Sequence, residues 1–127
     1  MKRTRLFLLA MFVVSLAIGL SAAPKDATLE GTLVDSKCYL ADNSLTGNDH
    51  GAMKNCGTIC LKGGSPGGLL TKDKKFYAII APATALADHV GHTVRVTGSI
   101  HNGSVLAKKL EVQKAGKWEE VKLGVMM

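Results

Sequence analysis

HTVRVTGSIHNGSVLAKKLEV, residues 92–112, is the stretch that decides the fold class. Apolar and polar side chains alternate around Val94 and Val96, which is typical of a β-strand with one buried face. The pair Asn102-Gly103 favours a two-residue β-hairpin turn. The apolar positions that follow, up to Val112, predict the partner strand. The sequence therefore predicts an antiparallel hairpin and a mainly β protein.

Further strands are predicted on both sides of this hairpin. Residues 27–35 alternate like a half-buried strand, residues 69–71 and 75–80 indicate two strands joined by a lysine-rich turn, and residues 117–123 indicate a last strand. A short helix is expected from Pro82 to Val90, because proline suits a first helical turn and Gly91 suits a helix end.

A helical insertion is expected after the first strand. Residues 41–49 are polar and indicate a loop, in which Asn48 or Asp49 is placed to cap a helix over residues 50–62. The glycine-rich residues 63–68 end that helix. With this insertion, the order of elements predicts a small five-stranded OB-like (Greek-key) barrel with a second short helix. Gly31 and Gly98 suit the bends of such a barrel.

One apolar face per strand defines the predicted core. Side chains on the inward face alternate with outward ones along each strand. The residues expected to face inward are Leu29, Leu33, Ile79, Val94, Val96, Val105 and Leu110.

The first 23 residues have the three parts of a secretory signal peptide. Basic residues at the start precede an uncharged apolar run over residues 6–20, and Ser21-Ala22-Ala23 follows. A periplasmic or secreted location is predicted, with cleavage between Ser21 and Lys25 and no stable membrane span afterwards. Residues 24–127 are then expected to form a single β-barrel domain.

Charge and motif content narrow the function classes. Removing residues 1–23 takes away three basic residues and no acidic one, so the formal net charge falls from +6 to +3. Arg95 is then the sole arginine, whereas phosphate recognition favours arginine, so no nucleic-acid partner is expected. The sequence has no nucleophile-elbow, haem-attachment or phosphate-loop motif. These features favour a binding role over an enzymatic one.

The residues that could carry chemistry form a Cys/His set. Cys38, His50, Cys56 and Cys60 together supply three sulfurs and one imidazole. Such a Cys3His set is a known complement for tetrahedral zinc, and soft thiolates also select Cu(I). We therefore take these four residues as candidate ligands for zinc or copper(I). Met53 is a further soft donor, although a core position is expected for it.

Two other interpretations stay open at the cysteines. An odd number of cysteines in an exported protein also fits one disulfide plus a spare thiol, or a redox-active thiol pair. A helix over residues 50–62 would hold the Cβ atoms of Cys56 and Cys60 roughly 5 to 6 Å apart, too far for an unstrained disulfide but suitable for one metal. In the disulfide case, an unknown small ligand or protein is expected to bind an exposed barrel face near Phe76, Tyr77 or Trp118.

The same residues carry a resemblance to a family of small exported bacterial proteins. The shared features are Asp35-Ser36-Lys37-Cys38, His50, Cys56 with Cys60, and Gly64-Ser65-Pro66. The resemblance spans residues 31–98 and ends in a segment, residues 91–98, that looks like the family's closing strand. It implies a shared fold and a shared cluster, and it implies no activity. The interval between His50 and Cys56 is longer than is usual in that family.

Overall fold

The computed structural model describes residues 23–124, in which one long strand, β1 (Asp26–Asp35), pairs on both sides. Its second half pairs antiparallel with β2 (Gly67–Thr71), and its first part pairs antiparallel with β4 (Thr93–His101). The remaining strands are β3 (Phe76–Ile80), β5 (Ser104–Lys114) and β6 (Lys117–Val121).

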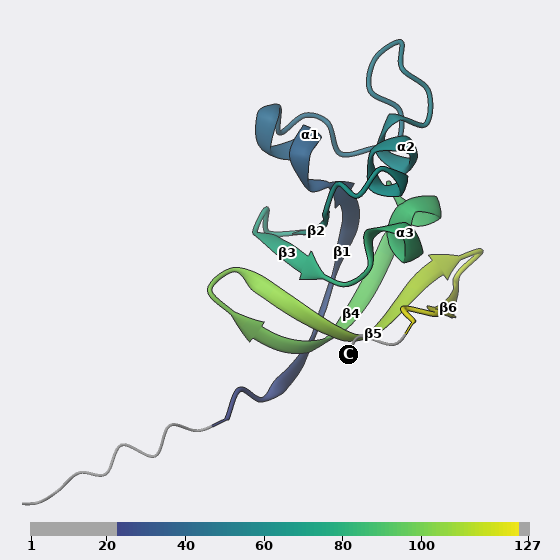
Figure 1. The fold of residues 1–127 in the computed structure, drawn as a ribbon. Coiled ribbons are helices and arrows are strands. Elements are labelled where there is room, and N and C mark those ends of the chain that lie inside the picture. Colours follow the sequence, from purple (N-terminus) through teal and green to yellow (C-terminus); the bar gives the residue numbers. More distant parts are fainter. Residues whose placement is uncertain (1–22, 125–127) are drawn as a thin grey trace, which may run out of the picture.

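A parallel pairing of β3 with β5 closes the sheet into a barrel (Figure 1). Antiparallel pairs join β2 to β3 and β4 to β5, so the ring runs β1, β2, β3, β5, β4 and back to β1. The predicted five-stranded OB-like barrel is confirmed. β6 lies outside the ring as a hairpin partner of β5.

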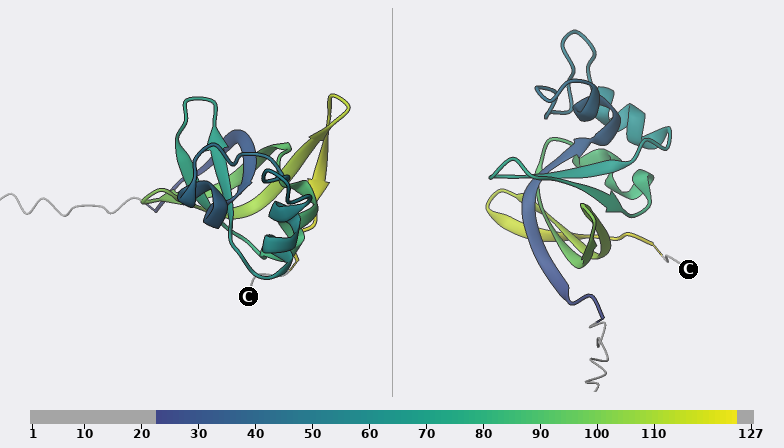
Figure 2. Two further views of the ribbon diagram at one scale, coloured as in Figure 1. Left: turned by 90° about the horizontal axis from the view of Figure 1, so that it is seen from above. Right: turned by 90° about the vertical axis from the view of Figure 1, so that its left-hand side faces the viewer.

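The helices are short and lie in two connections. α1 (Ser36–Ala41) and α2 (Cys56–Lys62) both belong to the connection between β1 and β2. They gather at the end of the barrel where β1 ends, away from the first described residues (Figure 2). α3 (Ala83–Leu86) continues into the 3-10 helix η1 (Ala87–His89) between β3 and β4, as predicted. Within residues 23–124, no helix has the length and apolarity needed to cross a bilayer.

The core follows the predicted alternation of side chains. Leu33, Ile79, Val94, Val96, Val105 and Leu110 are buried inside the barrel. Leu29 packs against this cluster but is only half-buried, since it lies toward the open start of β1. Leu61 of α2 and Leu86 of α3 add to the same core, and Leu61 thereby fixes the insertion to the barrel.

Two predicted glycine and turn positions are also confirmed. Asn102 and Gly103 have φ values of 46° and 72°, the left-handed pair that a tight hairpin turn requires. At Gly98, where the β4–β5 register shifts, a Cβ atom would lie 1.8 Å from the backbone oxygen of Leu106. Only glycine therefore permits this close strand approach.

The insertion and the strand after it differ from the prediction in four respects. The helix predicted over residues 50–62 is wrong in its first part: α2 begins only at Cys56. Gly51 and Asn55 have φ values of 60° and 53°, which interrupt a right-handed helix, and a His50–Met53 bridge forms instead. Met53 is 63% exposed, so its expected core position is wrong. α1 and the start of β2 at Gly67 were not predicted. The predicted signal peptide, apart from Ala23, lies outside the described residues.

Candidate metal site

The three cysteine sulfurs meet where the insertion lies over the end of β1. Cys38 comes from α1, while Cys56 and Cys60 lie one turn apart on α2. The Sγ atoms of Cys56 and Cys60 are 4.0 Å apart, and the Sγ atom of Cys38 lies within 4.8 Å of each. All three residues are free thiols. The structure therefore brings together the three predicted sulfur donors in a triangle.

Asp35 is the residue that starts α1 and so places Cys38. Its Oδ1 atom accepts a hydrogen bond from the backbone N–H of Lys37 at 3.0 Å, the usual contact of a helix N-cap. The hydroxyl of Ser65 donates to the same oxygen at 2.7 Å. Asp35 is fully buried. The Asp35 carboxylate thus links the first turn of α1 to the segment that precedes β2.

The segment Gly64-Ser65-Pro66 ties the two helices of the insertion together. The backbone N–H of Ser65 donates to the carbonyl of Cys60, and the carbonyl of Pro66 accepts from Ser36, both at 3.0 Å. These bonds link the end of α2 to the start of α1. This segment therefore fixes the position of Cys60 relative to Asp35.

The residues between the two cysteines of α2 hold that helix on the barrel. Gly57 faces Val90 so closely that a Cβ atom would lie 2.5 Å from its Cγ1 atom. The Thr58 hydroxyl donates to the carbonyl of Ala87 at 2.9 Å. Asn48 caps α2 from the preceding loop, because its Oδ1 atom accepts from the Thr58 N–H at 2.8 Å. The predicted N-cap position at Asn48 or Asp49 is wrong, because Asn55 is the N-cap residue of α2, but Asn48 does accept from the first turn of the helix across the loop.

His50 reaches the sulfurs from a turn instead of a helix. The backbones of His50 and Met53 exchange two hydrogen bonds, of 2.9 and 3.1 Å, which close the turn. The Nε2 atom of His50 lies 3.1 Å from the carbonyl of Gly47 and donates to it. Its Nδ1 atom is buried and has no hydrogen-bond partner. Metal-binding histidines are commonly held in this way, with one nitrogen on a carbonyl and the other free.

Two further donors border different edges of the sulfur triangle. A ring nitrogen of His50 lies within 4.8 Å of the sulfurs of Cys38 and Cys56. A carboxylate oxygen of Asp35 lies within 4.8 Å of the sulfurs of Cys38 and Cys60. Asp35 is not among the four ligands predicted from the sequence, where it belongs only to the Asp35-Ser36-Lys37-Cys38 resemblance. The signal that could have identified it is its place in Asp35-Ser36-Lys37-Cys38, three residues before a candidate ligand.

The carboxylate and the thiols influence each other's protonation. Burial raises the pKa of the Cys38 thiol to about 12, and the adjacent Asp35 carboxylate adds to the rise. Burial and Asp35 also raise the pKa of Cys60. Burial raises the pKa of Asp35 too, but the Ser65 hydroxyl, the facing thiols of Cys38 and Cys60 and the Lys37 N–H together lower it below its ordinary value. The negative charge thus resides on Asp35, and a metal must displace thiol protons to bind.

The donor set fits a metal ion. Two buried polar atoms at the cluster, Asp35 Oδ2 and His50 Nδ1, have no hydrogen-bond partner, which is costly unless another group satisfies them. Cys60 also lines a surface hollow with Lys37 and residues 63–66, so a small ion has a path to the sulfurs.

Comparison with known proteins identifies no relative of this chain. No protein-family model, no curated protein and no solved structure matches this chain. The resemblance based on Asp35-Ser36-Lys37-Cys38 and the cysteines therefore stays a prediction.

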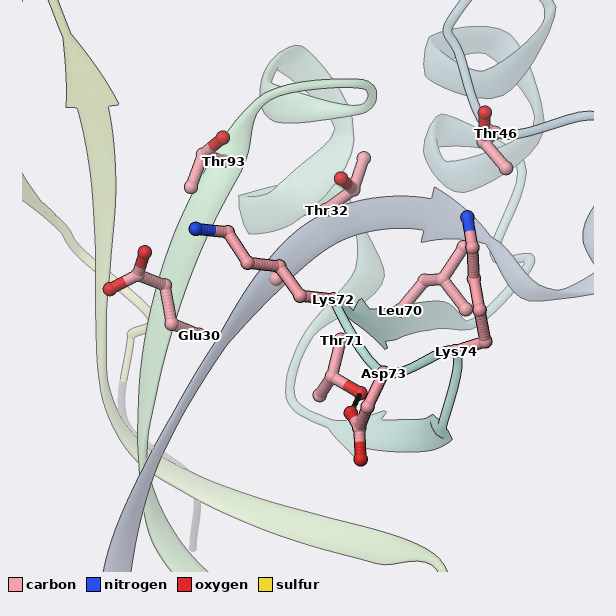
Figure 3. A pocket seen from close by; sticks show the side chains of 10 residues that line it. Glu30, Thr32, Thr46, Leu70, Thr71, Lys72, Asp73, Lys74 and Thr93 are labelled. Carbon is pink, nitrogen blue, oxygen red and sulfur yellow. Dashed lines mark hydrogen bonds between the residues drawn. The ribbon is translucent and has the colours of Figure 1, made fainter.

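A larger groove lies elsewhere on the barrel and contains none of the candidate ligands. It has a volume of about 520 Å³ and lies between β1 and the turn from β2 to β3 (Figure 3). Its polar side chains include Thr32, Thr71, Lys72 and Asp73. No cysteine or histidine lines it, so it offers no soft metal ligand.

The aromatic side chains suggested as a binding face are engaged within the chain. Phe76 stacks on Tyr39 of α1 with ring centroids 5.4 Å apart. The guanidinium of Arg95 lies 4.3 Å from the ring centroid of Trp118. Tyr77 packs against the core. These contacts weaken the interpretation of an open aromatic surface.

Proposed function

We propose that this protein is an exported metal-binding module, in which Cys38, His50, Cys56 and Cys60 hold a zinc or copper(I) ion. The observation that carries the proposal is the triangle of three sulfurs bordered by a histidine with a free, buried Nδ1 atom. The three sulfurs come from two helices that separate contacts fix to the barrel. Their approach therefore follows from the fold and does not depend on one flexible loop.

The sulfur spacing supports a metal better than a disulfide between Cys56 and Cys60. Two thiolates bound to one tetrahedral zinc, each at about 2.3 Å, lie about 3.8 Å apart. The sulfurs of a disulfide lie about 2.05 Å apart. The separation of 4.0 Å between Cys56 and Cys60 is close to the first value.

The proposed location rests on the sequence of residues 1–23. Outside the cytoplasm, thiols are exposed to oxidation unless a metal protects them. Expression of the full chain in a bacterial host, with N-terminal sequencing of the periplasmic protein, tests export. A start between Ser21 and Lys25 is expected, and an intact Met1 on membrane-bound material would contradict the prediction.

Elemental analysis combined with thiol counting tests the metal site. Protein purified from the periplasm without reductant and under oxygen-free conditions is analysed for zinc and copper before and after treatment with a chelator. One equivalent of metal is expected, with three thiols that react with an alkylating reagent only after chelation. Added Zn(II) or Cu(I) should also raise the melting temperature of the stripped protein, because an ion that binds only the folded state stabilises it.

The opposite results identify the alternatives. Absence of metal, no thermal shift and one free thiol before any chelator would overturn the proposal in favour of a disulfide-stapled barrel. Reversible oxidation of Cys56 and Cys60 by a dithiol-disulfide buffer, again without metal, would favour thiol-disulfide exchange.

A further inference from the structure

We infer that Asp35 is a fifth ligand of the cluster and that its carboxylate tunes the site toward Zn(II) and away from Cu(I). This inference rests on the proposed metal-binding function and deepens it, since the sequence alone left the metal open. It assigns a binding role to a residue outside the four ligands that the sequence predicts.

Burial and missing partners indicate that Asp35 has a second role besides capping α1. Its Oδ1 atom has two donors, the Lys37 N–H and the Ser65 hydroxyl. Its Oδ2 atom is buried and has no hydrogen-bond partner. Besides its bonded donors, the carboxylate faces only the thiols of Cys38 and Cys60, which are weak donors, so burial removes the hydration of Oδ2 without an equivalent replacement, which is costly. A cation beside Oδ2 would remove that cost.

The position of Asp35 matches that of a ligand. Its carboxylate borders the Cys38–Cys60 edge of the sulfur triangle, whereas His50 borders the Cys38–Cys56 edge. Zinc sites are usually four-coordinate and sometimes expand to five, so both groups can serve beside the sulfurs. Asp35 lies at the junction of β1 and α1, and its other oxygen is fixed by two hydrogen bonds. It is therefore better pre-positioned than His50, which lies in a turn.

Ligand chemistry gives the metal preference. Thiolates bind both Zn(II) and Cu(I), but a carboxylate oxygen is a normal zinc ligand and a poor partner for a soft monovalent ion. The carboxylate also adds a negative charge to a buried group of thiolates, and a divalent ion neutralises more of that charge than a monovalent one. Asp35 should thus strengthen zinc binding and contribute little to copper(I) binding.

Competition titrations of the reduced full chain test this inference. Affinities for Zn(II) and for Cu(I) are measured against a colorimetric chelator of each ion, for the wild type, Asp35→Asn and Ser65→Ala. Asparagine keeps an oxygen that can accept from the Lys37 N–H, so it replaces mainly the charged ligand. Ser65→Ala removes a partner of Oδ1 and leaves Oδ2 intact, which makes it the matched control for the structural role.

We expect Asp35→Asn to weaken Zn(II) binding at least about tenfold, as loss of a group at a metal site commonly does. We expect the same variant to change Cu(I) binding by less than about threefold, and Ser65→Ala to change either affinity by less than about threefold. An equal loss for both ions, or no loss for either, would overturn the assignment of Asp35. If the wild type binds neither ion, the proposed function itself is overturned.

A second measurement needs no variant and applies even where Asp35→Asn fails to fold. Zn(II) is added to the metal-free wild-type chain, and the infrared difference spectrum is recorded. A carboxylate that binds the ion must shift its stretching bands. A difference spectrum with thiol loss but no carboxylate change would show that Asp35 is not a ligand.

Discussion

Gly57 of α2 lies against Val90, and a Cβ atom at this position would be 2.5 Å from Val90 Cγ1 and 3.3 Å from its Cβ. Val90 is buried and β-branched, so it has little freedom to move. Gly57→Ala should therefore destabilise the protein by about 1 to 3 kcal/mol through overpacking, despite the better helix propensity of alanine. Chemical denaturation of the metal-free protein measures this change.

Gly63 is the matched control for that substitution. It ends α2 with an ordinary φ of −81°, and a Cβ atom there would approach backbone oxygens no closer than 3.4 Å. Gly63→Ala should change the free energy of unfolding by less than about 0.5 kcal/mol. Equal effects at the two glycines would contradict the close packing of α2 on the segment after η1.

The acid side of the stability profile should depend on Glu111. Hydrogen bonds from Arg95 and Lys109 hold the pKa of Glu111 below its ordinary value. A lowered folded-state pKa means that the ionised group stabilises the fold above its ordinary pKa. This stabilisation is lost as the pH falls through the lower, folded-state value. Glu111→Gln should thus lower stability at neutral pH and reduce the loss on acidification, measured by denaturation between about pH 7 and pH 2.

Glu120 provides a control of opposite sign. It lies directly across from Glu111 in the β5–β6 register, and like charges in such pairs are destabilising. Glu120→Gln should leave neutral-pH stability unchanged or slightly raised. A loss equal to that of Glu111→Gln would show that the Arg95 contact is not the cause.

The barrel was predictable because its signals are local. Alternation at Val94 and Val96 and the turn pair Asn102-Gly103 each specify a strand or a hairpin within a few residues. Given the predicted order of strands and helices, few arrangements bury the apolar face of every strand, and the OB-like barrel is one of them.

The insertion was less predictable because long-range contacts decide it. Left-handed φ values at Gly51 and Asn55 shorten α2, and although glycine and asparagine both tolerate this conformation, the local sequence does not require it. The capping of α2 by Asn48 spans ten residues, from Asn48 Oδ1 to the Thr58 N–H. The place of Asp35 three residues before Cys38 is a weak local signal, and only the folded structure shows that its Oδ2 atom is buried without a hydrogen-bond partner. Composition therefore indicated the cysteines and His50 but not Asp35.

A substitution on the inward face of β4 should cost more folding stability than a substitution on the outward face of β5. Val94 is fully buried, whereas Lys108 is exposed and forms a surface ion pair with Asp26 at 2.8 Å. Val94→Ala should cost about 1 to 3 kcal/mol, because it removes buried methyl groups and leaves a cavity. Lys108→Ala should cost less than about 0.5 kcal/mol, since exposed ion pairs contribute little. Urea titration of both variants distinguishes them, and similar costs would refute the inward assignment.

Substitution of a cysteine ligand should impair metal binding more than substitution of His50. Cys56→Ser and Cys60→Ser each remove one corner of the triangle, and we expect both to abolish the rise in melting temperature that added metal gives the wild type. His50→Ala should weaken binding by about tenfold or more without abolishing it, because three sulfurs remain and His50 lies in a turn.

His101→Ala is the matched control, since His101 is an exposed imidazole at the end of β4, outside the cluster. Thermal unfolding with and without one equivalent of Zn(II) measures all four variants. Because Cys56 is buried and serine introduces a polar hydroxyl there, each variant is compared with its own metal-free form. If His50→Ala and His101→Ala bind Zn(II) equally well, His50 is not a ligand. If either cysteine variant keeps the full thermal shift, the sulfur triangle does not hold the ion.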